Sequence, residues 1–142
     1  MTAIAQRAPT VVVDVANVMG ARADGWWRDR ADAALRLCRE VAVLAARGVP
    51  ADRMPSGLPA PGGWVLVLEG AARAAAGVFP GDPPLVRVVP APGAGDDAIA
   101  AEAASAGGAC LVVTADRELR RRCTRAGAAV TGPRWLLTLL SL

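Results

Sequence analysis

Apolar residues in this chain fall into short continuous runs, which predict strands that are buried on both faces. The clearest run is Thr10-Val-Val-Val-Asp14, which is β-branched and does not alternate with polar residues, as is typical of a central strand in a parallel sheet. Four later runs predict further strands at residues 64–68, 85–89, 110–114 and 129–131. Strands of this kind need helices on both faces of the sheet to cover them.

Helical spacing appears in the segments between these runs. Residues 28–47 have the best amphipathic pattern, because Leu35, Cys38, Ala42 and Ala45 recur at helical spacing. Three more helices are predicted at residues 96–106, 116–126 and 133–140. The alternation of strands and helices predicts an α/β fold, a three-layer α/β/α sandwich around a mostly parallel sheet. A single domain spanning residues 1–142 fits this length.

The segment 49–63 interrupts this alternation. It holds four prolines and three glycines without any apolar period, which predicts a surface loop.

No apolar run approaches the roughly 20 residues of a membrane span. The three cysteines, Cys38, Cys110 and Cys123, are nowhere spaced as C-x-x-C, so neither a disulfide framework nor a thiolate zinc site is expected. We therefore expect a cytoplasmic protein with no membrane partner, as a monomer or a homodimer.

The ionisable side chains exclude several classes of enzyme. All 16 basic residues are arginine, and the chain has no lysine, histidine or tyrosine. Serine–histidine triads, histidine-ligated zinc sites and P-loops that bind phosphate through lysine are therefore excluded. The net charge of +3 permits a nucleic-acid partner without requiring one. Carboxylates, arginine, serine, threonine and cysteine remain for chemistry.

Five acidic residues follow the predicted strands closely, and they are Asp14, Glu69, Asp96, Asp97 and Asp116. The carboxyl ends of the strands form the ligand-binding edge of an open α/β sheet, so we expect these side chains to gather there. Without lysine or histidine nearby, their mutual repulsion is unfavourable unless cations lie between them. Oxygen ligands alone favour Mg²⁺ or Mn²⁺ over Zn²⁺. The pattern therefore predicts a divalent metal site suited to phosphoryl chemistry.

Helix capping is the alternative interpretation of two of these acids. Asp96 and Asp116 each stand where a side-chain oxygen can accept a hydrogen bond from the first turn of a predicted helix. For either residue alone, capping is favoured. Capping does not explain Asp97, which lies one position inside its helix, or Asp14, which ends an apolar strand.

Three motifs occur in order along the chain: Asp14-Val-Ala-Asn17-Val, Gly95-Asp96-Asp97-Ala-Ile99 and Val113-Thr114-Ala-Asp116-Arg117-Glu118-Leu119. Together they resemble the PIN-like NYN nuclease family, particularly its bacterial YacP-type members. The segments Asp24-Gly-Trp-Trp-Arg28 and Gly132-Pro-Arg-Trp-Leu136 are similar to segments of an actinobacterial branch. The resemblance implies a PIN-like fold with strands in the order 3-2-1-4-5 and metal-dependent hydrolysis of RNA phosphodiester bonds.

The resemblance also implies roles for individual residues. Asp14, Asp97 and Asp116 correspond to the metal-binding acids of the catalytic centre. Asn17 corresponds to the catalytic polar residue that completes the first motif, for which a local turn bond is the alternative role. Asp96 corresponds to an auxiliary metal-binding acid.

Two further candidates have weaker support. Thr114 resembles the hydroxyl residue that commonly precedes the last acid of the family, and we expect it to contact the substrate. Glu69 has no firm counterpart in the family and ranks below the aspartates as a metal ligand. The chain also departs from the commonest first motif, Asp-Gly-x-Asn, because Val15 replaces the glycine. The backbone after the first strand therefore has fewer accessible conformations at this position.

Arginine and tryptophan side chains are the other candidates for RNA binding. The arginines expected to contact phosphates are Arg73, Arg117, Arg120 and Arg121. Arg122 and Arg125 are expected to form a solvated helix face. Trp26 can stack on an unpaired base. In the alternative interpretation, one of the two rings of Trp26 and Trp27 packs beneath the following helix and the other is exposed.

Three functions are compatible with these features. The leading hypothesis is a metal-dependent endoribonuclease that acts on single-stranded RNA. The first alternative is a phosphohydrolase of nucleoside triphosphates in the same cleft. The second is a catalytically degenerate RNA-binding or interaction module, which the presence of all the matched acids disfavours.

Overall fold

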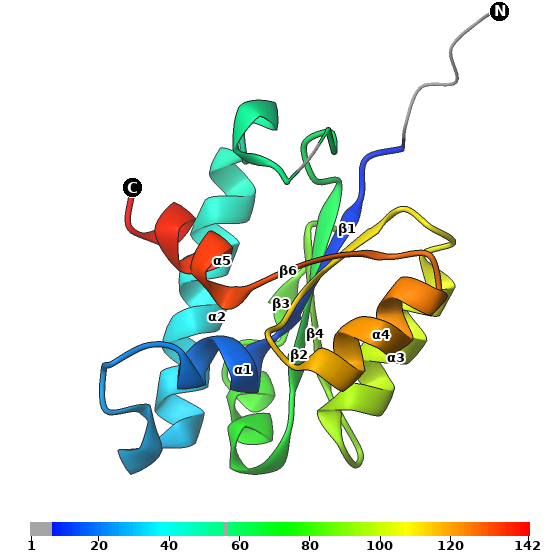
Figure 1. Ribbon diagram of the computed structural model, residues 1–142. Coiled ribbons are helices and arrows are strands. Elements are labelled where there is room, and N and C mark those ends of the chain that lie inside the picture. The colour runs from blue at the N-terminus through cyan, green and yellow to red at the C-terminus, as the bar shows by residue number, and fades with distance from the viewer. Residues whose placement is uncertain (1–6, 56) are drawn as a thin grey trace, which may run out of the picture.

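A six-stranded sheet forms the centre of the computed structural model, which describes residues 7–55 and 57–142 (Figure 1). The strands are β1 (Thr10–Asp14), β2 (Gly63–Leu68), β3 (Gly81–Asp82), β4 (Val86–Pro90), β5 (Cys110–Val113) and β6 (Ala129–Thr131). Their order is β3-β4-β2-β1-β5-β6, and every neighbouring pair is parallel except β3 and β4. The five predicted strands are therefore present in the expected order, and the two-residue β3 adds an edge that the sequence did not predict.

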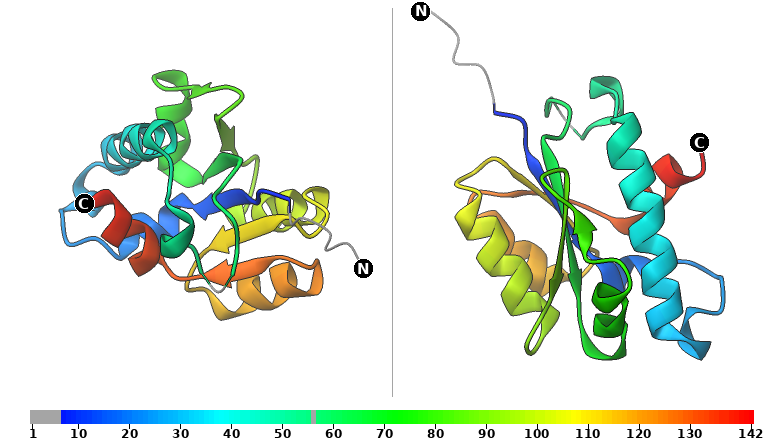
Figure 2. Two further views of the ribbon diagram at one scale, coloured as in Figure 1. Left: turned by 90° about the horizontal axis from the view of Figure 1, so that it is seen from above. Right: turned by 180° about the vertical axis from the view of Figure 1, so that it is seen from behind.

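Helices cover both faces of the sheet, which confirms the three-layer architecture, as Figure 2 shows from above and from behind. On one face lie α3 (Gly95–Ser105) and α4 (Arg117–Arg125). On the other face lie α1 (Val15–Gly20), α2 (Arg30–Arg47) and α5 (Pro133–Leu140). Three 3-10 helices complete the elements: η1 (Trp26–Arg28), η2 (Ala51–Arg53) and η3 (Gly70–Gly77).

Alternate residues of each central strand pack into two separate cores. In β1, Val11 and Val13 pack on the side of α1, α2 and α5. Val12 packs on the other side, with Ile99 of α3 and Leu119 of α4. None of the three valines has exposed surface, which explains why the apolar run is continuous. Burial on both faces fixes β1 firmly, so its last residue is held at a defined place on the edge of the sheet.

Two short helices follow strand ends where the apolar pattern did not predict them. α1 begins at Val15, directly after β1, and has six residues. η3 begins at Gly70 after β2 and consists mostly of alanine and glycine. A helix shorter than two turns or made of small residues gives no clear apolar period. Both helices nevertheless border the edge of the sheet where the acids lie.

The start of α2 differs from the predicted start at residue 28. Residues Trp26–Arg28 form η1, and α2 begins at Arg30. Asp29 is the N-cap, because its Oδ1 accepts a hydrogen bond from the backbone nitrogen of Asp32 at 2.9 Å.

The proline- and glycine-rich segment 49–63 contacts the core at two points. Val49 and Met54 are both buried, and the indole nitrogen of Trp135 in α5 donates a hydrogen bond to the carbonyl oxygen of Arg53 at 2.8 Å. The surface loop predicted here is therefore anchored by these contacts. None of the described helices is both long and apolar enough to cross a membrane.

Candidate functional site

The carboxyl edge of the sheet is organised around the buried carboxylate of Asp14. This residue ends β1 and is 6% exposed. Its Oδ1 accepts a hydrogen bond from the backbone nitrogen of Asn17 at 3.3 Å, which makes Asp14 the N-cap of α1. Its Oδ2 accepts one from the hydroxyl of Thr114 at 2.9 Å. The part of the chain that the structure describes contains no arginine paired with Asp14.

Thr114 connects two turns at this edge. Its hydroxyl donates to Asp14 and accepts a hydrogen bond from the backbone nitrogen of Asp116 at 3.2 Å. Asn17 makes a second connection, because its Oδ1 accepts a hydrogen bond from the backbone nitrogen of Ala115 at 2.8 Å. Asn17 therefore does not make the local turn bond considered from the sequence, but holds the turn after β1 against the turn after β5.

Burial and repulsion both act against ionisation at this edge. The pKa of Asp14 is raised from 3.8 to about 6, by burial first and to a smaller extent by the charges of Glu69 and Asp96, against the lowering effect of its hydrogen bonds. The pKa of Asp96 is also raised, by burial first and then by the charges of Asp116 and Glu69. Asp14, Glu69, Asp96 and Asp116 thus share one electrostatic environment, and we refer to these four residues as the acidic cluster.

Glu69 is anchored to the start of α3. Its Oε2 accepts a hydrogen bond from the backbone nitrogen of Gly95 at 3.0 Å. The N-cap residue of α3 is Ala94, which has no side-chain oxygen, so Glu69 supplies that acceptor from the end of β2. A Cβ at Gly95 would lie 3.2 Å from Cδ of Glu69, so Gly95 permits this close approach.

The two capping predictions have different outcomes. Asp116 does cap α4, because its Oδ1 accepts a hydrogen bond from the backbone nitrogen of Leu119 at 2.9 Å. The prediction that Asp96 caps α3 is wrong, since α3 begins at Gly95 and Asp96 is the second residue of the helix. Asp14 is a cap that the sequence analysis did not anticipate, because α1 was not predicted.

Asp97 is largely exposed, although its charge also contributes to the raised pKa of Asp96. Its side chain is 78% exposed, and its Oδ1 lies 3.0 Å from a guanidinium nitrogen of Arg122 in α4. Asp96, its neighbour in the helix, is partly buried and interacts with the other three acids. Of the two acids at the start of α3, Asp96 is therefore the one whose charge raises the pKa of Asp14. Arg122, which was expected on a solvated face, joins α3 and α4 instead.

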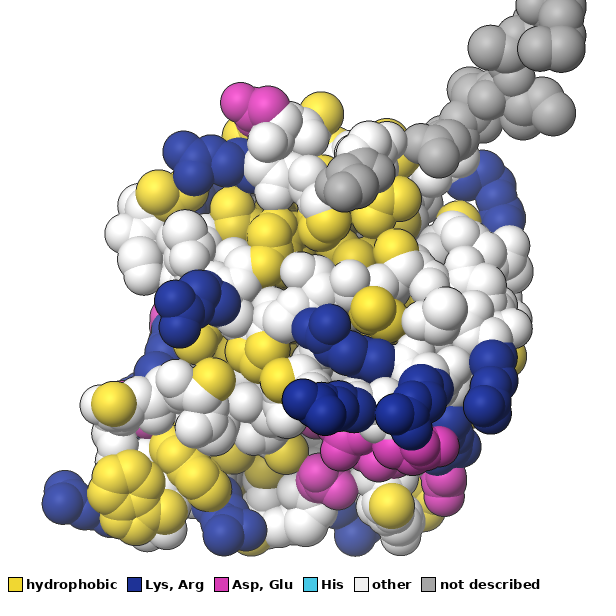
Figure 3. Space-filling view, in the orientation of Figure 1, with side chains coloured by type: hydrophobic (Ala, Val, Ile, Leu, Met, Phe, Trp, Pro, Cys, Tyr) yellow, Lys and Arg dark blue, Asp and Glu magenta, His cyan; other side chains and the backbone are white. Residues whose placement is uncertain are grey.

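Arginine side chains form a row over α4, and acidic side chains lie beside that row near the starts of α3 and α4 (Figure 3). The Nε of Arg120 donates a hydrogen bond to the carbonyl oxygen of Thr114 at 2.7 Å, so this arginine supports the turn after β5. Arg121 pairs with Glu118 at 3.3 Å on the surface. Arg73 and Arg117 are exposed and form no ion pair with any described residue.

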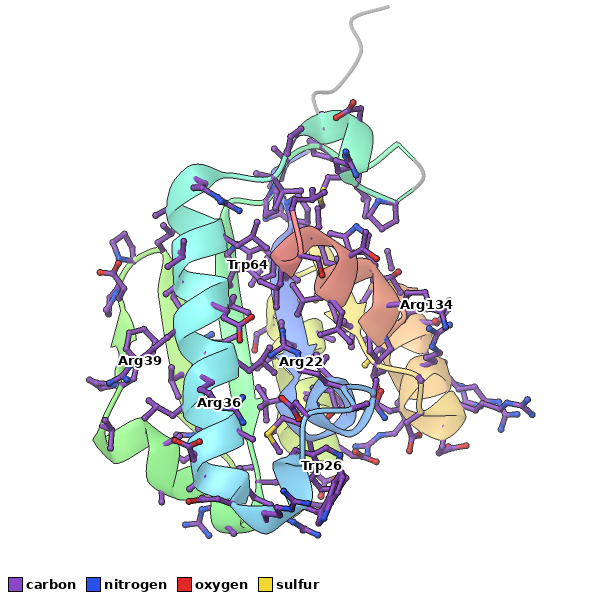
Figure 4. The ribbon with its side chains drawn as sticks, turned by 90° about the vertical axis from the view of Figure 1, so that its left-hand side faces the viewer. Arg22, Trp26, Arg36, Arg39, Trp64 and Arg134 are labelled. Atoms are coloured by element: carbon purple, nitrogen blue, oxygen red, sulfur yellow. The ribbon has the colours of Figure 1, made fainter. Side chains whose placement is uncertain are left out.

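Trp26 lies in η1 near the start of α2 (Figure 4). Its half-buried ring packs against the core, as the alternative interpretation expected. The ring centroid lies 6.0 Å from that of Trp27, at an interplanar angle of 87°. The guanidinium of Arg30 lies 5.3 Å from the Trp26 centroid, within cation–π distance.

The donor atoms of the acidic cluster fit a hard divalent cation. They are carboxylate oxygens, which Mg²⁺ and Mn²⁺ prefer. The three cysteines are buried, and burial raises the pKa of both Cys38 and Cys110 to about 12, so these thiols do not compete as thiolates. Within residues 7–55 and 57–142, no three side chains of ligand type converge enough to hold one ion. A bound ion therefore requires the carboxylates to turn toward one another.

The chain is similar in structure to Rae1 (YacP) from Bacillus subtilis, whose crystal structure superposes with a TM-score of 0.56 at 16% sequence identity. The match covers 93% of this chain and 74% of that one. At this identity the likeness shows a shared fold, which is the fold implied by the three sequence motifs. No family model and no curated protein sequence matches the chain.

Sequence reasoning missed the contributions of Gly95 and Arg120 to this site. Gly95 was noted only as part of a motif, although a glycine directly before two acids at a helix start was a usable signal. Arg120 was interpreted as a phosphate contact, whereas it binds the carbonyl of Thr114. Its partner is six residues away, and a sequence pattern gives no sign of such a side-chain contact.

Proposed function

We propose that this protein is a metal-dependent endoribonuclease whose centre is the acidic cluster. The observation that supports this most strongly is the position of Asp14, which is buried without a cationic partner among the described residues and is opposed by Glu69 and Asp96. A divalent cation would relieve this repulsion. The family resemblance of the three motifs supports RNA as the substrate class, and the fold shared with Rae1 (YacP) agrees with the fold which that resemblance implies.

The metal ligands in this proposal are Asp14, Asp96 and Asp116, with Glu69 as a fourth. Asp96 replaces Asp97 in this set, because Asp97 pairs with Arg122. Asp116 uses Oδ1 in its cap, and its other oxygen has no described hydrogen-bond partner. Mg²⁺ or Mn²⁺ at this position would activate a water molecule and stabilise negative charge on the leaving oxygen.

The remaining residues of the site position this chemistry. Thr114 holds the Asp14 carboxylate, and Arg120 holds the backbone of Thr114. The side-chain oxygen of Asn17 is occupied by Ala115, so its amide nitrogen is the group that can donate to a phosphate oxygen or a water molecule. With no histidine or lysine in the chain, proton transfer to or from a side chain falls to carboxylates.

Exposed arginines complete the proposed RNA contacts. Arg73 lies in η3 after Glu69, and Arg117 begins α4 after Asp116. Each follows a member of the acidic cluster within four residues of sequence, and guanidinium groups suit bidentate contacts with phosphate. Arg121 can also contact phosphate if it releases its ion pair with Glu118, because a surface ion pair contributes little free energy.

Cleavage of labelled single-stranded RNA in Mn²⁺ by the wild type, Asp14→Asn and Asp116→Asn tests this proposal. We expect roughly a 100-fold loss or more in both variants. Asp82→Asn is the matched control, because Asp82 is exposed in β3 and outside the cluster, and it should cleave like the wild type. Faster hydrolysis of nucleoside triphosphates than of RNA would instead identify a nucleotide phosphohydrolase. RNA binding without cleavage would identify a binding module.

A further inference from the structure

A pocket of about 320 Å³ adjoins the acidic cluster between α1, η1 and η3. Its lining includes Ala16, Met19, Trp26, Arg30, Glu69 and Ala72. Its size lies at the lower end of the roughly 300–1,000 Å³ typical of small-molecule sites. The pocket is therefore large enough for a single planar group.

Glu69 belongs both to this pocket and to the acidic cluster. Its carboxylate is fixed by the hydrogen bond from Gly95, so the wall between pocket and cluster has a defined position. Ala16 lies in the first turn of α1, two residues after Asp14. A nucleotide whose phosphate lies at the cluster thus has its base or a neighbouring base within reach of the pocket.

The lining has the chemistry of a base-stacking site. Met19 and Ala72 are buried and give an apolar floor. Trp26 provides an aromatic surface, and Arg30 adds a cation that is exposed and makes no described ion pair. Aromatic rings and arginine planes are the groups on which unpaired bases of RNA stack.

Ion pairs with α2 hold the segment that carries Trp26. Arg22 forms a bidentate pair with Glu40, with both contacts at 2.8 Å. Asp24 lies 3.5 Å from Arg36. Figure 4 shows Arg36 on α2 and Arg22 beside that helix, both above Trp26 in that view. Trp26 is therefore positioned before any ligand binds, which lowers the entropic cost of stacking.

We infer that this pocket binds one unpaired nucleobase of the RNA strand, next to the phosphate that lies at the acidic cluster. The base stacks against Trp26, and its neighbouring phosphate is directed toward Glu69 and Asp14. A base within a duplex cannot enter without being unpaired and unstacked, so the pocket selects single-stranded RNA. The inference deepens the proposed function and rests on it for the identity of the strand.

Binding of short single-stranded RNA with non-hydrolysable backbone linkages, measured in Mn²⁺, tests this inference without any cleavage step, because the cation relieves the repulsion between the phosphate and the acidic cluster. One abasic nucleotide is moved stepwise along the RNA, and affinity is measured for the wild type, Trp26→Ala and Trp27→Ala. Trp27 is the matched control, because it is 57% exposed and does not line the pocket. Since Trp26 packs on the core, Trp26→Phe and a melting measurement accompany the alanine variant.

We expect one abasic position to weaken wild-type binding about tenfold and Trp26→Ala to weaken it by a similar factor. The two changes together should weaken it no further, and Trp27→Ala should stay within about twofold. Equal affinity at every abasic position, or equal effects of the two tryptophan variants, would overturn the inference. The abasic scan uses the unaltered protein, so a folding defect in a variant cannot decide the outcome.

Failure of the pocket and failure of the nuclease proposal are distinguishable. Metal-dependent cleavage with no position-dependent abasic effect would leave the nuclease proposal intact and overturn the pocket. A position-dependent abasic effect that is lost in Trp26→Ala, together with absent cleavage, would support the pocket and overturn the nuclease. No measurable binding of single-stranded RNA would overturn the pocket.

Discussion

The hydroxyl of Thr114 donates a hydrogen bond to Oδ2 of Asp14 at 2.9 Å, and the two residues are 100 positions apart in the sequence. Both side chains are buried. They meet because β1 and β5 are adjacent parallel strands in register. The carboxylate of Asp14 is thus held by hydrogen bonds from the segments that follow β1 and β5.

Substitution of Thr114 by valine tests this relationship. Valine keeps the branched shape but removes the donor, so Asp14 stays buried with one partner fewer. We expect the free energy of unfolding to fall by about 1–3 kcal/mol in chemical denaturation. Thr138→Val, at an exposed position of α5, is the control and should change it by less than about 0.5 kcal/mol. Equal changes in the two variants would show that the hydrogen bond is unimportant.

The raised pKa of Asp14 gives the metal-free protein a specific dependence on pH. The unfolded chain titrates this carboxyl near 3.8 and the folded protein near 6, so between these values the folded state binds more protons. The stabilising contribution is therefore complete below the unfolded pKa and is lost as the pH rises through about 6. The change amounts to about 3 kcal/mol.

Unfolding of the wild type and Asp14→Asn in EDTA, followed from about pH 4 to about pH 7, measures this contribution. Asparagine is also a good N-cap, so the variant keeps the start of α1. The wild type should lose stability relative to the variant as the pH rises. Parallel profiles would mean that Asp14 titrates normally in the folded state.

Asp96 and Asp97 make different contributions in this account, although they are adjacent. Asp96→Asn removes a member of the acidic cluster, and we expect RNA cleavage to fall roughly 100-fold. Asp97→Asn breaks the ion pair with Arg122, which lies largely on the surface, and should lower the rate by less than about tenfold. Initial rates at saturating Mn²⁺ decide between them. A larger loss in Asp97→Asn would restore the role that the family resemblance gave to Asp97.

Gly95→Ala tests the close contact between α3 and Glu69. The added Cβ would lie 3.2 Å from Cδ and 3.3 Å from Oε2 of Glu69, so the carboxylate must move and its hydrogen bond weakens. We expect the free energy of unfolding to fall by about 1–3 kcal/mol and more Mn²⁺ to be needed for cleavage. Gly93→Ala is the control, because no atom lies within 4 Å of that Cβ. If Gly95→Ala behaves like Gly93→Ala, Glu69 does not depend on this contact.

The sheet was predictable from the sequence because its strands are buried on both faces. Residues such as Val12 and Val112 have no exposed surface, and such strands leave continuous apolar runs. β3 has two residues and α1 has six, which is too short for a periodic pattern to emerge. The start of α2 was misplaced for another reason, since the cap at Asp29 depends on a local hydrogen bond with Asp32.

The site was only partly predictable. That Asp14 and Asp116 lie at one edge follows from strand topology, because both follow parallel strands. Whether Asp96 or Asp97 joins them depends on which side of α3 faces the other acids, because successive residues of a helix point about 100° apart. The start of α3 at Gly95 is capped by Glu69, 26 residues earlier, and the surface position of Asp97 is set by Arg122. Side-chain contacts between distant residues decided this point, and motif spacing does not encode them.

The most direct test of the central claim is the rate of single-stranded RNA cleavage measured against Mn²⁺ concentration for the wild type and Asp14→Asn. The account predicts a rate that rises from zero in EDTA to saturation in the wild type. The same titration of the variant should show a loss of roughly 100-fold or more at every concentration. Cleavage that persists in EDTA, or equal rates for the wild type and Asp14→Asn, would contradict a metal-dependent centre at Asp14.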